Sequence, residues 1–127
     1  MRELDDVIVT YALTESIHVP SMSPHLSCTP EKLIAEGVAA ADAGASIIHV
    51  HVRDRETGEP TSDLSLFREV ARGISEETDA IIQPTTGGVI TMSVKERAAV
   101  VPELEPEMAS CIPSVGSLDN PQQQAEV

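Results

Sequence analysis

The chain has 127 residues, with 8 Lys and Arg against 21 Asp and Glu, so its formal net charge is −13 at pH 7. This length is too short for a complete eight-stranded α/β barrel, which needs ~250 residues. An acidic surface repels nucleic-acid phosphates, and with no Trp, one Tyr and one Phe the chain lacks aromatic platforms for stacking bases. Nucleic-acid binding is therefore disfavoured. Membrane insertion is disfavoured as well, because no apolar run approaches the ~20 residues of a spanning helix.

The first half of the chain predicts a strand, a helix and a second strand. Residues 7–13 form an apolar, β-branched run of strand length, and the loop that follows contains several prolines and hydroxyl residues. Thr29 is placed to cap the start of a helix with an apolar stripe from Leu33 to Ala41, and Gly44 is placed as its C-terminal glycine cap. Residues 46–52 carry apolar side chains on both faces, which is typical of a strand in a covered parallel sheet.

The second half repeats this order after a predicted loop over 53–62. Asp63 can cap a helix that extends to about Glu77, and residues 80–83 predict a third strand. Ser93 opens a capping box, and its helix is expected to stop before Pro102. A fourth strand is expected over 107–112.

The predicted order of elements is β-α-β-α-β-α-β, which indicates an α/β fold with a parallel sheet. We expect one domain over residues 1–119 and a disordered, Gln-rich tail over 120–127. The two cysteines, Cys28 and Cys111, lie far apart in a chain that does not begin like a secretory signal. They are therefore expected to be free thiols in a cytoplasmic protein.

His49 and His51 are the most informative pair of residues. Side chains two apart on a strand share a face, so both imidazoles are expected near the carboxyl end of the second strand, where parallel sheets place their active sites. Two His suit a zinc site that is completed by another ligand, and two His with a carboxylate also suit ferrous iron. The alternative is one buried and one solvent-facing His with no metal.

Three charged residues fall on the same rim of the predicted sheet. Arg53 and Asp54 follow the second strand, and they either orient an anionic substrate and support a metal-bound His or form an ion pair that shapes the loop. Glu15 follows the first strand and is a candidate acid, base or substrate ligand. A solvated rim charge is the alternative for Glu15.

A glycine-rich turn follows the third strand. Thr85, Thr86 and the glycines that end at Gly88 offer hydroxyl and backbone N–H donors that can bind a carboxylate, although a turn with positive φ explains the glycines equally well. Ser110, near the end of the fourth predicted strand, adds a further hydroxyl or serves packing alone. The sequence contains no Gly-x-Gly-x-x-Gly and no phosphate-binding Gly-x-x-x-x-Gly-Lys, so it gives no support for dinucleotide redox chemistry or nucleotide hydrolysis.

The combination of these motifs resembles the β-keto acid cleavage enzymes, typified by 3-keto-5-aminohexanoate cleavage enzyme. The resemblance runs from about Val7 to Leu118. It is carried, in chain order, by Pro20-Ser-Met-Ser-Pro24, His49-Val-His-Val-Arg-Asp54, Glu56-Thr-Gly-Glu-Pro60, Thr85-Thr-Gly-Gly88 and Pro106-Glu-Met-Ala-Ser110.

The resemblance implies a parallel (β/α)8 TIM barrel that uses a divalent metal, usually zinc, and exchanges acyl groups between a β-keto acid and acetyl-CoA to give acetoacetate and a CoA thioester. It implies that His49 and His51 are metal ligands, and that Thr85 and Gly88 bind the substrate carboxylate. It also implies that Glu15 and Ser110 make further substrate contacts, with Glu15 as the catalytic candidate.

Members of this family are roughly twice as long as this chain. We therefore expect a half barrel with the first four strands and three helices, lacking the third metal ligand and having little or no cleavage activity alone. A homo-oligomer or a complementary C-terminal half would cover its open strand edges. A non-catalytic remnant or assembly subunit and a different two-His metal enzyme using iron are the competing interpretations.

Overall fold

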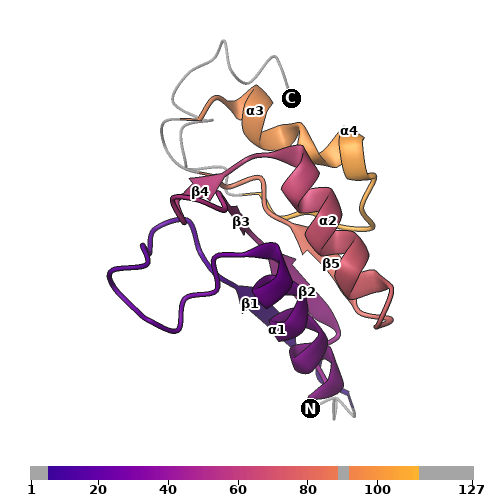
Figure 1. The fold of residues 1–127 in the computed structure, drawn as a ribbon. Helices are drawn as coiled ribbons and strands as arrows, with labels where there is room; N and C mark the ends of the chain where they lie inside the picture. Colours follow the sequence, from indigo (N-terminus) through magenta and orange to yellow (C-terminus); the bar gives the residue numbers. More distant parts are fainter. Residues whose placement is uncertain (1–5, 89–91, 112–127) are drawn as a thin grey trace, which may run out of the picture.

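A computed structural model describes residues 6–88 and 92–111 of the chain (Figure 1). Its central element is a three-stranded sheet of β1 (Thr10–Leu13), β2 (Ile47–Val50) and β5 (Ile81–Pro84), in the order β1-β2-β5. Both strand pairs are parallel. The predicted α/β class with a parallel sheet is confirmed.

The predicted strand over 46–52 is interrupted at His51. Beyond this residue, β3 (Val52–Arg53) forms a separate antiparallel pair with β4 (Pro60–Thr61). The loop predicted over 53–62 therefore contains a strand pair. Its turn is closed by two backbone hydrogen bonds, from Asp54 N–H to Glu59 O at 2.8 Å and from Gly58 N–H to Asp54 O at 2.9 Å.

Helices α1 (Pro30–Asp42) and α2 (Leu64–Ser75) begin where the sequence predicts. The Thr29 side chain accepts a hydrogen bond from the backbone N–H of Lys32, and the Asp63 carboxylate accepts from the second and third N–H groups of α2. These side chains satisfy backbone donors that have no partner within a helix. The predicted end of the second helix, near Glu77, lies two residues beyond its observed end.

The predicted single helix that stops before Pro102 is wrong. The capping box at Ser93 does open α3 (Val94–Ala98), but a second short helix, α4 (Val100–Leu104), follows at once and contains Pro102. Pro102 is the third residue of α4. The first turn of a helix tolerates proline, because its N–H groups have no partner inside the helix.

The fourth strand predicted over 107–112 is also wrong for the residues that the structure describes. Only an isolated parallel bridge joins Thr85 to Ser110 there. The Ser110 N–H donates to Pro84 O at 3.2 Å, and the Thr86 N–H donates to Ser110 O at 3.2 Å. Pro84 has no N–H, so only its carbonyl can extend the ladder on this side. Ile112 and the tail over 120–127 lie outside the described residues.

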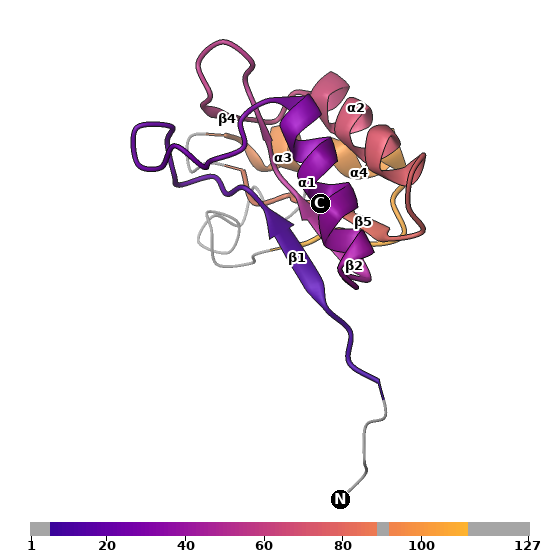
Figure 2. The same ribbon diagram turned by 60° about the horizontal axis from the view of Figure 1, so that its bottom comes forward.

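Helices α1 and α2 cover one face of the sheet (Figures 1 and 2). From β1 and β2, Leu13, Ile48 and Val50 project into the core and are fully buried. The strand register places Ala12, His49 and Gln83 side by side in one row across the sheet. Because side chains alternate along a strand, this row lies on the opposite face from Ile48 and Val50. The buried core comprises Leu13, Leu33, Ile48, Val50, Val52, Leu66, Phe67, Val70, Ile74 and Val100.

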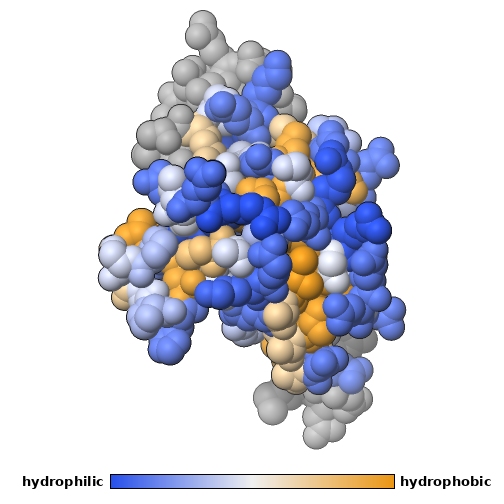
Figure 3. Space-filling view, in the orientation of Figure 1, coloured by the Kyte–Doolittle hydropathy of each residue, from blue (hydrophilic) through white to orange (hydrophobic). Residues whose placement is uncertain are grey.

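Two glycines let α1 and α2 pack closely. A Cβ atom at Gly37 would lie 2.6 Å from Ile74 Cδ1, and one at Gly73 would lie 2.5 Å from Ile34 Cδ1. Each helix thus offers a glycine to an isoleucine of the other. The surface on the side of α1 and α2 is mainly hydrophilic, with an apolar strip between these two helices (Figure 3).

Cys28 and Cys111 are both free thiols, as predicted. In the part of the chain that the structure describes, no helix has the length and apolar character needed to cross a membrane.

Candidate metal and carboxylate site

The two histidines meet at the carboxyl end of β2. His49 is on the strand, and His51 lies in the break between β2 and β3. Their Nε2 atoms are 3.2 Å apart, and the rings meet edge to face with centroids 5.0 Å apart. The prediction that both imidazoles share one face near the end of this strand agrees with this geometry, although the strand itself is interrupted.

Burial keeps both rings neutral at pH 7. Desolvation lowers the pKa of His49, and it lowers the pKa of His51 to about 4 with smaller contributions from the charges of His49 and Arg53. The Nδ1 atom of His49 lies 3.0 Å from Gln83 Oε1. Because an amide oxygen can only accept, Nδ1 of His49 carries the hydrogen in this arrangement, and the Nε2 lone pair of His49 accepts from His51 Nε2–H at 3.2 Å.

This arrangement fits two ligands of a metal ion. Two nitrogen atoms each bound about 2.0–2.1 Å from a tetrahedral zinc ion lie about 3.3 Å apart, close to the observed 3.2 Å. Neutral imidazole is also the form that binds metal. Residues 6–88 and 92–111 contain no cluster of three or more His, Cys, Asp and Glu side chains that could hold a metal ion. The described residues therefore supply two ligands of such a site.

Arg53, two residues after His51, holds the neighbouring backbone in place through side-chain hydrogen bonds. Its side chain is 1% exposed, and it donates from Nε to Thr14 Oγ1 at 2.7 Å and from Nη1 to Gly58 O at 2.8 Å. A further bond runs from Nη2 to Glu15 O. These contacts join the end of β1 to the β3–β4 turn. They favour the loop-shaping alternative, but through neutral oxygen atoms and not through an ion pair with Asp54.

Asp54 stabilises its own turn. Its carboxylate accepts from the backbone N–H groups of Thr57 at 2.8 Å and Glu56 at 2.9 Å, and from the Thr57 hydroxyl at 3.1 Å. These bonds, above all those to Thr57, lower the pKa of Asp54. The carboxylate is therefore committed to the turn and not to the His pair.

Glu15 lies just beyond β1, at the same edge of the sheet as the His pair. Its side chain is 56% exposed, and its Oε2 atom is 3.2 Å from Nδ1 of His18 in the following loop. The position agrees with the predicted rim residue. The partner of the carboxylate is His18, which the sequence analysis did not connect with it.

The turn after β5 brings Thr85 and Ser110 together. Thr85 is 6% exposed, and its Oγ1 accepts from the Gly87 N–H at 2.9 Å and faces the Ser110 hydroxyl at 3.5 Å. Gly88 adopts φ +54°, and a Cβ atom there would lie 2.6 Å from Arg97 Cδ. The positive-φ interpretation of the glycines is thus correct at Gly88. It does not conflict with carboxylate binding, because a turn can both require glycine and present N–H groups.

The sequence profile described as BKACE, beta-keto acid cleavage enzyme, matches residues 6–123. The chain belongs to the β-keto acid cleavage enzyme family. The His pair and the Thr-Gly-Gly turn both lie within the matched residues.

Curated relatives of this family agree with that assignment. The chain is 45% identical to the 3,5-dioxohexanoate:acetyl-CoA acetone transferase of Paraburkholderia graminis over 89% of its length. It is 40% identical to the 3-keto-5-aminohexanoate cleavage enzyme of Acetoanaerobium sticklandii over 84% of its length. It is 34% identical to the 3-dehydrocarnitine:acetyl-CoA trimethylamine transferase of Rhizobium meliloti over 90%. The matches cover 36%, 39% and 42% of these relatives, so the chain spans well under half of their length.

Two residues at this candidate site were missed by the sequence analysis. Gln83 contacts His49, and Arg97 donates from Nη1 to Gly87 O at 2.8 Å behind the Thr-Gly-Gly turn. Gln83 lies on the third predicted strand, but the register that pairs it with His49 is known only from the structure. Arg97 gave no signal either, because it reaches the turn from a separate helix.

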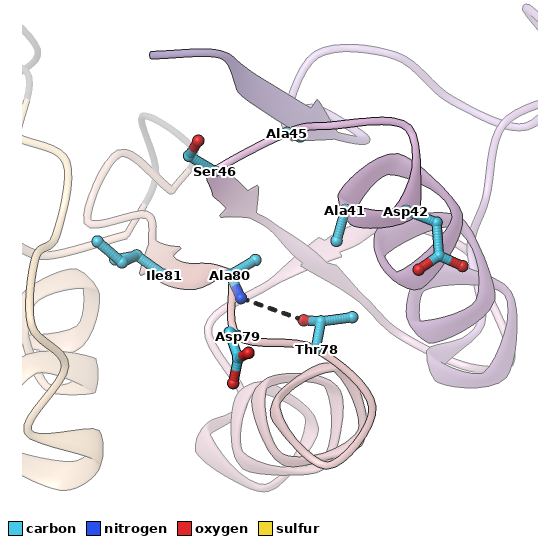
Figure 4. A pocket seen from close by; sticks show the side chains of 8 residues that line it. All are labelled: Ala41, Asp42, Ala45, Ser46, Thr78, Asp79, Ala80 and Ile81. Atoms are coloured by element: carbon cyan, nitrogen blue, oxygen red, sulfur yellow. Dashed lines mark hydrogen bonds between the residues drawn. The ribbon is translucent and has the colours of Figure 1, made fainter. Parts of the chain in front are cut away.

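A surface hollow lies at the opposite end of the sheet. It is formed by residues near the ends of α1 and α2 and the starts of β2 and β5, where the Thr78 hydroxyl accepts from the Ala80 N–H at 3.4 Å (Figure 4). None of its lining residues belongs to the His pair or to the turn after β5: Ala41, Asp42, Ala45, Ser46, Thr78, Asp79, Ala80 and Ile81. The candidate site is therefore separate from this hollow.

Proposed function

We propose that this chain carries the metal-binding and carboxylate-binding part of a β-keto acid cleavage site. In the proposed reaction, a β-keto acid and acetyl-CoA exchange acyl groups, giving acetoacetate and a new CoA thioester. The main observation in support is the neutral His49–His51 pair with its Nε2 atoms 3.2 Å apart. The names of two relatives, which include acetyl-CoA, support the choice of co-substrate.

In this proposal His49 and His51 hold a zinc ion. Zinc supplies Lewis-acid stabilisation of negative charge on a keto oxygen. The His rings are already neutral and close together, so zinc binding needs no large rearrangement, and only the hydrogen on His51 Nε2 has to move to Nδ1 before that nitrogen can bind. The remaining ligands come from water, from substrate or from residues outside 6–88 and 92–111.

The turn after β5 holds the acid group of the substrate. The Thr85 hydroxyl and the Gly88 N–H act as donors to the carboxylate, and Ser110 adds its hydroxyl from the bridged segment. Arg97 supports the turn through the Gly87 carbonyl. Glu15 faces the same edge and acts as acid, base or substrate ligand, while Arg53 fixes the backbone on which Glu15 stands.

The proposed fold is the first part of a (β/α)8 barrel. The sheet face that carries Ala12, His49 and Gln83 would then form part of the barrel interior, and α1 and α2 part of the outer ring. Further strands would complete the enclosure, from a second copy, a complementary chain or a longer form of this chain, because β1 ends the described sheet with an unpaired edge.

Metal binding tests the proposal directly. The purified chain is incubated with equimolar zinc and ferrous iron under anaerobic conditions, dialysed and analysed for metal by mass spectrometry. We expect about one zinc ion per chain, lost in His49→Ala and His51→Ala and kept in the loop variant His25→Ala. Iron in place of zinc would favour the different metal enzyme, and no bound metal would overturn the proposal.

Substrate binding is tested on the zinc-loaded chain. We expect acetoacetate to shift the amide NMR signals of Thr85 and Gly88, and Thr85→Val to weaken that binding. Shifts confined to residues far from the turn would contradict the assigned carboxylate site. Acetyl-CoA-dependent thioester formation is measured alongside, with rates near background expected for these 127 residues alone.

A further inference from the structure

Gln83 lies directly beside His49 on the neighbouring strand of the sheet. The two residues are register partners in the parallel β2–β5 pair, and the Oε1 atom of Gln83 is 3.0 Å from His49 Nδ1. Both side chains are partly buried. Water therefore competes less for this hydrogen bond than for one on an exposed surface.

The backbone fixes Gln83 relative to His49. Two hydrogen bonds flank the pair, from Ile81 N–H to Ser46 O and from Thr85 N–H to Val50 O, each at 3.0 Å. Gln83 can thus reach His49 without ordering a loop. The backbone of Gln83 is already ordered by the sheet, and only the rotamer freedom of its side chain is lost when the contact forms.

The chemistry of the contact determines what His49 can do. A neutral imidazole has one N–H and one lone pair, and the acceptor oxygen of Gln83 places the N–H at Nδ1. The lone pair is then at Nε2, the atom that faces His51 Nε2. If the N–H were at Nε2 instead, that atom could not bind a metal.

We propose that Gln83 is a positioning residue for His49, holding the ring in the Nδ1–H form and in the orientation that offers Nε2 to a metal ion. This inference rests on the proposed function insofar as it takes the His pair as metal ligands. Hydrogen-bonding partners of this kind typically change metal affinity about 10- to 100-fold when they are removed.

The hydrogen bond is tested first on the metal-free chain, so that this readout does not depend on metal. Nitrogen-15 chemical shifts of the His49 ring identify which nitrogen carries the hydrogen. We expect Nδ1–H in the wild type and in Gln83→Glu, which keeps an acceptor. In Gln83→Leu we expect a mixture or the Nε2–H form. The control Ile81→Val, on the same strand and face, should match the wild type.

Metal affinity is then measured with zinc against a chromogenic chelator, and with cobalt(II) by its visible absorption. We expect Gln83→Leu to weaken zinc binding about 10- to 100-fold, and Gln83→Glu to keep or strengthen it. Ile81→Val should leave the affinity unchanged. Far-UV circular dichroism shows whether each variant is folded. If Gln83→Leu does not fold, the proposal is tested with Gln83→Glu instead.

The outcomes separate the two ideas. Wild-type His49 in the Nε2–H form, or wild-type affinity in a folded Gln83→Leu, overturns the role of Gln83 alone. Loss of zinc binding in Gln83→Glu to the same extent as in His49→Ala also overturns it. Absence of metal binding in the wild type, with the Nδ1–H form present, overturns the proposed function and the positioning role with it.

Discussion

Replacing Arg53 with Met should destabilise the protein by an amount that its contacts determine. Met replaces the aliphatic stem of Arg53 with an unbranched apolar side chain but removes the guanidinium donors to Thr14, Glu15 and Gly58. The Gly58 hydrogen bond is buried, so its carbonyl loses a charged donor that no water replaces, at about 1.5–3 kcal/mol. The other two are partly buried and can recover water, at about 0.5 kcal/mol each. The expected loss is about 2.5–4 kcal/mol.

The assay is urea unfolding followed by far-UV circular dichroism. With a denaturant slope of about 2 kcal/mol per molar, within the usual range, this loss moves the midpoint by roughly 1–2 M. Arg72→Met is the matched control, because Arg72 is 77% exposed and pairs only within its helix, with Glu76. We expect its midpoint to stay close to the wild type. An Arg53→Met midpoint no lower than that of the control would refute the structural role of this guanidinium. Arg53→Lys should fall between them.

Three further variants or conditions test other parts of the structure. Gly73→Ala should destabilise by about 1–3 kcal/mol in thermal melts through its clash with Ile34, and adding Ile34→Val should restore part of the loss; equal melting temperatures would contradict the close packing. Between pH 7 and 4, the free energy of unfolding should fall as the pH falls. The unfolded chain binds protons at His49 and His51 below about pH 6.5. In the folded protein burial lowers both pKa values, that of His51 to about 4, so the folded state binds these protons less readily. The fall should flatten in His51→Gln, and an unchanged slope would contradict the assignment. Asp63→Ala should cost about 1 kcal/mol by urea unfolding, since it removes the cap of α2, and no change would show that the cap is dispensable.

Local signals predicted the starts of the helices well. Thr29, Asp63 and Ser93 each cap a helix in the structure, because their side chains bond to backbone groups only two or three residues away. Such short-range interactions are encoded in consecutive residues. The end of the helical segment at Pro102 was mispredicted, since the sequence does not show that a new helix begins just before that proline.

The sequence predicted which residues form the candidate site but not the contacts that hold these residues in place. Strand alternation predicted that His49 and His51 lie together, and they do. The contacts of Arg53 and Gln83 depend on which strands become neighbours and in what register, which periodicity along a single segment does not specify. The same limit applies to Ser110, whose place beside Thr85 comes from a single bridge and not from a regular strand.

That bridge has a consequence for motion within the folded protein. Ser110 is joined to the sheet through two backbone hydrogen bonds, with Pro84 and Thr86, plus one from the Thr86 hydroxyl. Amide hydrogen exchange should therefore reveal local opening of Thr86 and Ser110 at a lower free energy than that of β2, whose strand is paired on both sides. A ligand that contacts both Thr85 and Ser110 would slow this exchange in proportion to its affinity. The exchange rates of the Thr86 and Ser110 amides would therefore report directly on ligand occupancy.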